Sequence, residues 1–212
     1  MNTTAFWAFV LVALIGVLTP GLDTMLILRH SLLGGRRVGV ATFLGINLGC
    51  LIWGTASVAG LSALLTASQL AYDIVRVAGA AYLLWLGGSA LWKSLPRNRV
   101  PQAQEVPAEP VRLTAWAALR SGMVTNLLNP KVGVFYVSLL PQFLPAGPAA
   151  LAWGPLLVAT HISIGLLWST ALVWVAGRAR ALFERQRVRA WLDRVTATVL
   201  VGLGLKLAVE GR

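Results

Sequence analysis

The chain has 212 residues, of which 57% are hydrophobic and 12% are charged, whereas a soluble globular domain carries about 25% charged and about 45–50% apolar residues. This apolar excess is too large for one buried core, so the composition excludes an ordinary soluble domain and indicates an integral membrane protein. The net charge of +11 would suggest a nucleic-acid partner in a soluble protein, but the basic residues lie in a few short connections, where we expect contact with anionic lipid and none with nucleic acid.

Six apolar segments are each long enough to cross a bilayer, which takes about 20 helical residues. They cover approximately residues 4–28, 38–66, 70–92, 115–144, 149–177 and 190–209. The predicted fold class is therefore an all-α integral membrane protein with six transmembrane helices in a single domain, residues 1–212. A polar, proline-rich cytoplasmic linker at 93–114 separates a first half, 1–92, from a second half, 115–212.

The apolar run from Phe6 to Leu18 is similar in length to the apolar region of a signal peptide. The first cationic residue of the chain is Arg29, however, and no small-x-small cleavage pattern follows the apolar run. A signal peptide carries its positive charge before that run, so we expect this segment to remain as a transmembrane span.

Positive charge alternates between successive connections. The basic connections hold Arg29, Arg36 and Arg37; then Lys93, Arg97, Arg99, Arg112 and Arg120; then Arg178, Arg180, Arg185, Arg187, Arg189 and Arg194. The other two connections, 67–72 and 141–150, carry no charged residue. Loops rich in Lys and Arg stay in the cytoplasm. The sequence therefore predicts a bacterial inner-membrane protein with cytoplasmic basic loops and both termini outside.

The first span is interrupted by proline and carries an acid. Pro20 cannot donate a main-chain hydrogen bond and disrupts the preceding turn, and Gly21 loosens the backbone further. A carboxylate within a span, here Asp23, costs several kcal/mol unless it is paired or hydrated. Two interpretations remain open: a substrate-binding break, or a packing kink with Asp23 capping a helix near the headgroups.

The fourth span is interrupted in the same way and carries a base. Pro130 follows Asn129, Lys131 lies near the middle of the span, and Asn126 adds a second amide. We expect Asp23 and Lys131 to face each other across a central cavity, where a zwitterion can engage both charges. A purely structural salt bridge between the two is the alternative.

Three further polar residues lie within predicted spans. Asn47 is flanked by Gly45 and Gly49, whose spacing allows another helix to approach closely, so Asn47 either lines the cavity or bonds a neighbouring helix. His161 is either a proton relay, together with Asp23, or a hydrogen-bonded packing residue. Cys50 is the only cysteine, so the chain has no internal disulfide.

Discontinuous helices in corresponding halves are the best sequence marker of a transporter's substrate site. Residues 40–42 recur as 158–160, both Val-Ala-Thr, and three spans per half would make such a repeat inverted in the membrane. The sequence contains no phosphate-binding loop, metal-ligand cluster or Ser–His–Asp set. We therefore expect no catalytic residue, metal or cofactor, and no enzyme activity.

At these two breaks the chain resembles the LysE/RhtB family of bacterial amino-acid exporters. The resemblance is carried by TPGLDT at 19–24, LRHS at 28–31, GGRRVG at 34–39, NLLNPK at 126–131 and LPQF at 140–143. It implies export of amino acids or close derivatives from the cytoplasm, driven by proton antiport.

By this resemblance the functional candidates are Pro20, Gly21, Asp23, Asn129, Pro130 and Lys131. The family's first motif usually has a second proline after the glycine, and here that position is Leu22. The departure implies a shallower first break and a different substrate pocket.

The sequence thus predicts a secondary transporter that exports an amino acid or close derivative by alternating access. The expected partners are that small molecule, protons and membrane lipid, and a glycine face allows two copies of the chain to pair. The alternatives are an exporter of another small solute, a cation or a drug, and a non-transporting membrane scaffold.

Overall fold

The computed structural model describes residues 3–67, 113–145 and 149–176, together with single residues scattered between 74 and 92 and between 178 and 205. Its elements are α1 (Thr3–Leu18), α2 (Leu22–Ala67), α4 (Ala115–Leu127), α5 (Pro130–Val134), a π-helical turn η2 (Phe135–Leu139), a 3-10 turn η3 (Leu140–Phe143) and α6 (Ala149–Trp174). The described residues form helices and no strand, which confirms the all-α prediction for this part of the chain.

Among the described residues, two helical stretches are long and apolar enough to cross a membrane, Leu22–Gly60 within α2 and Ala149–Trp174, which is α6. Apart from the scattered single residues, the predicted spans 70–92 and 190–209, and nearly all of the linker at 93–114, lie outside the described part of the chain. The six-span count, the inverted repeat and the division into two halves therefore remain predictions.

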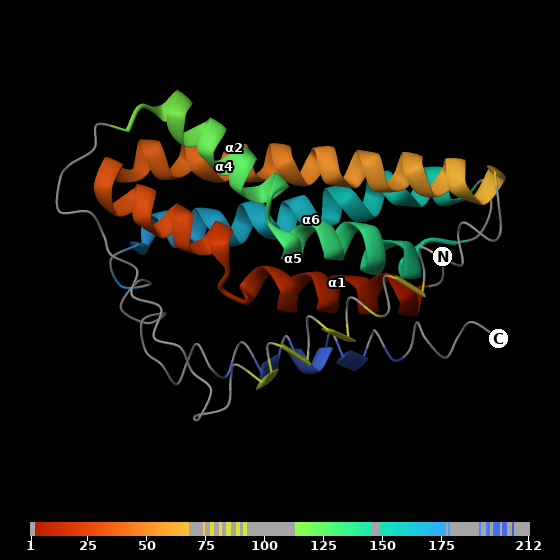
Figure 1. The fold of residues 1–212 in the computed structure, drawn as a ribbon. Coiled ribbons are helices and arrows are strands. Elements are labelled where there is room, and N and C mark those ends of the chain that lie inside the picture. Colours follow the sequence, from red (N-terminus) through yellow and green to blue (C-terminus); the bar gives the residue numbers. More distant parts are fainter. Residues whose placement is uncertain are drawn as a thin grey trace.

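The first break lies at the predicted place. Helix α1 ends at Leu18, where the amide of Thr19 still donates to the carbonyl of Ile15 at 3.1 Å. Pro20 and Gly21 are non-helical, and α2 starts at Leu22. Figure 1 shows that residues 22–34 run on in the general direction of α1 and that the chain then turns back within α2. The helical segment before this turn thus comprises α1 and residues 22–34. The bounds of the first span, 4–28, stay a prediction.

The turn within α2 depends on Gly35. This residue has φ 75° and ψ −179° inside an otherwise helical stretch, a conformation that is essentially restricted to glycine. Because the bend joins two helices at this one residue, Gly35 sets where the chain reverses. No sequence pattern around Gly35 predicted this role.

We expect Gly35→Ala to lower the stability of the detergent-purified protein by about 1–3 kcal/mol, because alanine is strained at this backbone conformation. Thermal unfolding measures the loss. Gly60→Ala, in the same helix, is the matched control, since a methyl group there would meet no atom within 4 Å. Equal melting temperatures for the two variants would contradict the role given to Gly35.

The second break also lies at the predicted place. Helix α4 ends at Leu127, and α5 begins at Pro130, a position where the missing amide hydrogen costs nothing. Asn129 caps the new helix, because its side-chain oxygen accepts from the amide of Lys131 at 3.1 Å. Residues 115–143 therefore form one helical segment that is interrupted at Leu128 and Asn129, and this segment lies within the predicted span 115–144.

Helices α2 and α4 pack closely because each helix places a glycine against the main chain of the other. A methyl group at Gly45 would overlap the main-chain carbonyl of Leu119, and one at Gly122 would overlap the carbonyl of Thr42. Gly49 leaves room for the side chain of Asn126. The expected packing role of Gly45 and Gly49 is confirmed, and it brings Asn126 of α4 against α2.

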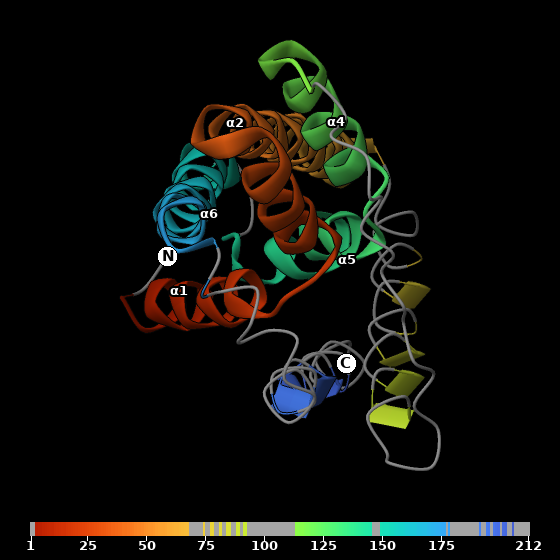
Figure 2. The same ribbon diagram turned by 90° about the vertical axis from the view of Figure 1, so that its left-hand side faces the viewer.

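The helices surround a centre into which both breaks project. Figure 2 looks along the bundle and shows α1, α2, α5 and α6 arranged around it, with α4 outside on α2. An aromatic cluster fills the end near the start of α1; its core is Phe9, Phe135, Tyr136, Leu139 and Phe143. A second cluster, the Gly35-end cluster, is formed by Ile27, Leu28, Phe43, Ile46, Leu172 and Val173. Both clusters contribute side chains to the cavity described next.

Candidate functional site

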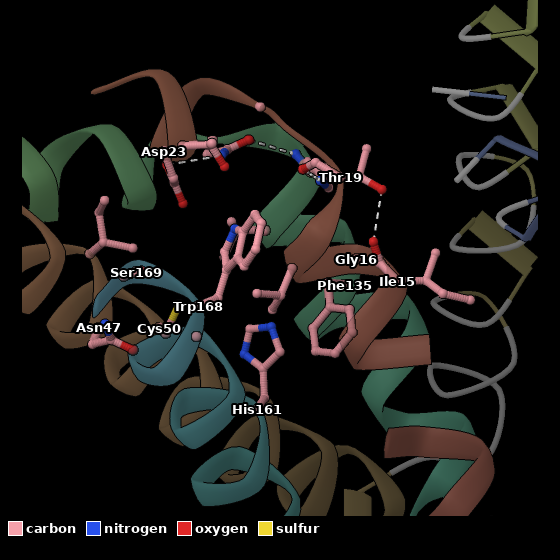
Figure 3. Close-up of a pocket in the computed structure, with 18 of the residues that line it drawn as sticks. Ile15, Gly16, Thr19, Asp23, Asn47, Cys50, Phe135, His161, Trp168 and Ser169 are labelled. Carbon is pink, nitrogen blue, oxygen red and sulfur yellow. Dashed lines mark hydrogen bonds between the residues drawn. The ribbon is translucent and has the colours of Figure 1, made fainter. Parts of the chain in front are cut away.

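The centre of the bundle holds a cavity of about 120 Å³ bounded by α1, α2, α5 and α6. Six of the predicted site residues line it: Gly21, Asp23, Asn47, Asn129, Lys131 and His161. The remaining three, Pro20, Asn126 and Pro130, are not among its lining residues. Figure 3 shows the cavity with Asp23 and Thr19 at one side and His161 at another.

Asp23 is held by the opposite broken helix. One carboxylate oxygen accepts a hydrogen bond from Nδ2 of Asn126 at 2.7 Å, and the other accepts from Nδ2 of Asn129 at 3.1 Å. Asn126 is fully buried and Asn129 nearly so. The acid of the first break is therefore stabilised by two amides of the second.

Lys131 connects the second break to the first. Its Nζ donates to the main-chain carbonyl of Thr19 at 2.8 Å, and Thr19 directly precedes Pro20. A proline break deprives upstream carbonyls of their helical donors, and such groups need another partner in an apolar interior. Lys131 supplies that partner for the carbonyl of Thr19.

The two breaks are thus tied to each other in both directions; we call these contacts the crossed tie. They comprise Asp23, Asn126, Asn129, Lys131 and the carbonyl of Thr19. Asp23 and Lys131 line the same cavity and interact electrostatically, and each also has a hydrogen-bond partner of its own in the opposite break. The acid and the base therefore lie on one cavity, as the sequence predicts.

The amide of Asn129 can be oriented in only one way. Its Oδ1 accepts the amide of Lys131 as a helix cap, so its Nδ2 must be the group that meets Asp23. The amide of Asn126 is less constrained. Its Nδ2 meets Asp23 and also lies 3.4 Å from the sulfur of Cys50, whereas its buried Oδ1 has no hydrogen-bond partner among the described residues.

Asn47 lines the cavity and bonds within its own helix. Its Nδ2 donates to the carbonyl of Phe43 at 2.7 Å, and its Oδ1 lies near Gly165 of α6. Of the two interpretations left open by the sequence, the described contacts match the cavity-lining one.

His161 is held firmly on the aromatic side of the cavity. Its Nδ1 is 2.8 Å from the hydroxyl of Tyr136, and its ring stacks on Phe135 with centroids 4.4 Å apart and planes 24° apart. These contacts are those of a hydrogen-bonded packing histidine. A relay role stays a prediction.

Several lining groups escaped the sequence analysis. They are the carbonyl of Thr19 and the side chains of Cys50, Phe135, Trp168 and Ser169. Cys50 follows Asn47 by three residues, and Trp168 and Ser169 follow His161 by seven and eight. Such spacings place residues on one helix face, so this signal was available in the sequence. The acceptor role of Thr19 gave no signal, because any residue has a main-chain carbonyl.

Within the described ranges no group of three or more His, Cys, Asp or Glu side chains could hold a metal ion. The polar groups of the cavity instead offer one carboxylate, one ammonium group and amides. This set of groups suits a small molecule that carries one positive and one negative charge.

Apolar helices that are broken by proline and joined around a partly polar cavity are typical of membrane transporters with discontinuous helices. The chain belongs to the LysE type translocator family, whose sequence model matches residues 14–211. The family resemblance seen in the sequence is confirmed.

The sequences of several relatives align with nearly the whole chain. The chain is 28% identical to the uncharacterized membrane protein YrhP of Bacillus subtilis over 96% of this chain and 98% of the relative. It is 30% identical to a leucine efflux protein of Enterobacter sp. over 96% and 94%, and 24% identical to the threonine efflux protein of Escherichia coli over 97% and 98%. No solved structure matches the chain.

Proposed function

We propose that this protein exports an amino acid or a close derivative across the bacterial inner membrane. The observation that carries the proposal is the crossed tie, whose acid and base line the same cavity. The names of two relatives, for leucine efflux and threonine efflux, support an amino acid as the cargo.

The substrate's two charged groups match the two sides of the crossed tie. Its ammonium group binds Asp23, which Asn126 and Asn129 hold in position. Its carboxylate binds Lys131 and displaces the carbonyl of Thr19 from the ammonium group of that lysine. Substrate binding therefore replaces a contact between the two broken helices, which frees the helices to move relative to each other.

We assign alternating access to the two clusters that border the cavity. The aromatic cluster and the Gly35-end cluster each contribute side chains to the cavity lining. Opening one cluster at a time exposes the cavity to one side of the membrane. The π-helical turn at Phe135–Leu139 lies within the aromatic cluster, and such turns frequently mark functional sites in helices.

Proton antiport is the proposed driving force. A protonated Asp23 no longer attracts an ammonium group, so proton entry from the outside favours release of the substrate there. Loss of that proton to the cytoplasm restores the site for the next substrate. Asp23 is the proposed coupling residue.

The proposed orientation has cytoplasmic basic loops and both termini outside. The turn that carries Arg36 and Arg37 lies at the same end of the bundle as the start of α4 and the end of α6 (Figure 1). Arg36 stacks over the ring of Trp174 there, 4.3 Å from its centroid. The start of α1 lies at the opposite end, consistent with the positive-inside rule.

Cys50 provides a direct test, because it is the only cysteine in the chain and lines the cavity. We expect a transported amino acid, tested as L-leucine and L-threonine, to slow the reaction of Cys50 with a small thiol reagent in proportion to occupancy. Mass spectrometry of the purified protein measures the reaction.

Cys50→Ser, which cannot react, is the control for that experiment, and choline tests a cation without a carboxylate. If no amino acid protects Cys50, and cells that overproduce the protein release no additional amino acid, the scaffold alternative stands instead. Protection by choline alone would favour an exporter of cations or drugs.

A further inference from the structure

The glycines of the bundle fall into two groups that differ in the space beside them. At Gly54 and Gly154 a methyl group would lie 2.6 Å from a valine methyl of the facing helix, Val158 and Val58 respectively. These glycines are required for packing between α2 and α6. Exchange at such positions forces the helices apart.

The cavity glycines are different. Among the described residues, a methyl group at Gly165 would meet only Oδ1 of Asn47, at 3.4 Å, and one at Gly16 would meet no atom within 4 Å. Both residues line the cavity. A side chain at either position would therefore project into the cavity and not into a neighbouring helix.

Backbone conformation does not explain these two glycines either. Gly35 is the only residue with positive φ in the described part of the chain, so Gly16 and Gly165 have conformations open to any residue. Glycine inside a helix costs about 1 kcal/mol relative to alanine. What these two glycines contribute is open volume in the cavity, where any other residue would place a side chain.

Gly165 occupies the centre of the α6 face that borders the cavity. It lies one turn after His161 and one turn before Ser169, with Trp168 beside it. Away from the crossed tie the cavity walls are mostly aliphatic, and the contributing side chains include Val12, Ile15, Ile27, Ile46, Val132 and Leu139. The cavity of about 120 Å³ holds on the order of ten water-sized positions.

We propose that Gly165 is a specificity-determining residue, whose missing side chain accommodates the side chain of the transported amino acid. The preferred substrate class is then amino acids with an aliphatic side chain larger than that of alanine. This inference rests on the proposed function, since it assumes that the charged groups of an amino acid bind at the crossed tie. Gly16, on the facing helix α1, contributes in the same way.

The test compares binding of L-leucine, L-valine, L-alanine and L-serine by protection of Cys50 in the purified protein. The natural protein is expected to bind leucine or valine more tightly than alanine or serine. In Gly165→Ala the ratio of leucine to alanine affinity falls about tenfold, and in Gly165→Val it falls further, because one added methylene in an apolar pocket changes discrimination by about 10–200-fold.

Gly60→Ala is the matched control, because it makes the same exchange in a helix at a position that does not line the cavity. Gly16→Ala is a second variant, in case Gly165→Val does not fold.

An unchanged leucine-to-alanine ratio in Gly165→Ala and Gly16→Ala, with leucine still protecting the natural protein, overturns the inference alone. Preference of the natural protein for alanine or serine overturns the substrate class. Absence of protection by any amino acid overturns the proposed function, and the inference with it.

Discussion

Lys131→Met is expected to abolish amino-acid export while the protein still inserts into the membrane. The exchange keeps an unbranched apolar side chain of similar length but removes the ammonium group. Removing one member of a buried charged contact costs about 2–5 kcal/mol, which corresponds to roughly a thirtyfold or greater loss of substrate affinity. The carbonyl of Thr19 also loses its donor, so the crossed tie weakens in the empty protein.

The measurement is metabolite profiling of the medium around overproducing cells, with the amount of membrane-inserted protein determined in parallel. Arg36→Met is the matched control, because it removes a cation that stacks on Trp174 and does not line the cavity. Arg36→Met should leave export unchanged. Normal export by Lys131→Met would contradict the substrate site proposed here.

The two breaks were predictable from sequence because their signals are local. Proline removes a donor at its own position, and a charge in an apolar run is visible without knowledge of the fold. The same holds for Gly45 and Gly49, whose spacing predicts close helix packing. The approximate spans around Pro20 and Pro130 follow from these local signals.

The partners of the two charges were not predictable in the same way. Asn126 and Asp23 are 103 residues apart, and their contact depends on how α4 is rotated against α2. That rotation is set by the glycine contacts with main-chain carbonyls, which no periodicity reveals. The acid and base were expected to face each other, but the contacts to Asn126, Asn129 and the carbonyl of Thr19 emerge only from the packed helices.

Two local features also escaped prediction because they break helical periodicity. Gly35 reverses the chain within a run that has helical composition on both sides, so the sequence pattern did not show where the chain turns. The π-helical turn at Phe135–Leu139 takes in about one extra residue, which an α-helical periodicity does not anticipate.

Asp23→Asn is expected to abolish uphill transport and to leave downhill exchange measurable only at raised substrate concentration, because the neutral amide no longer attracts the substrate's ammonium group. Asparagine has nearly the same shape as aspartate but cannot exchange a proton at physiological pH. Its oxygen can accept from Asn129, whose amide orientation is fixed by the helix cap. Its nitrogen then faces Asn126, whose buried Oδ1 has no partner among the described residues and can accept once that amide turns over. The crossed tie therefore survives, and the titratable group is lost.

Proteoliposomes with an imposed pH gradient test this coupling. The natural protein should accumulate substrate against its gradient as protons move the opposite way, and Asp23→Asn should only equilibrate it. His161→Gln tests the second candidate relay residue. Because His161 is already bonded to Tyr136 and stacked on Phe135, we expect this variant to keep accumulating substrate in response to the pH gradient. If His161→Gln instead loses the response and Asp23→Asn keeps it, protons pass by the histidine. If the natural protein ignores the gradient, proton antiport itself is wrong, and the crossed tie serves passive exchange.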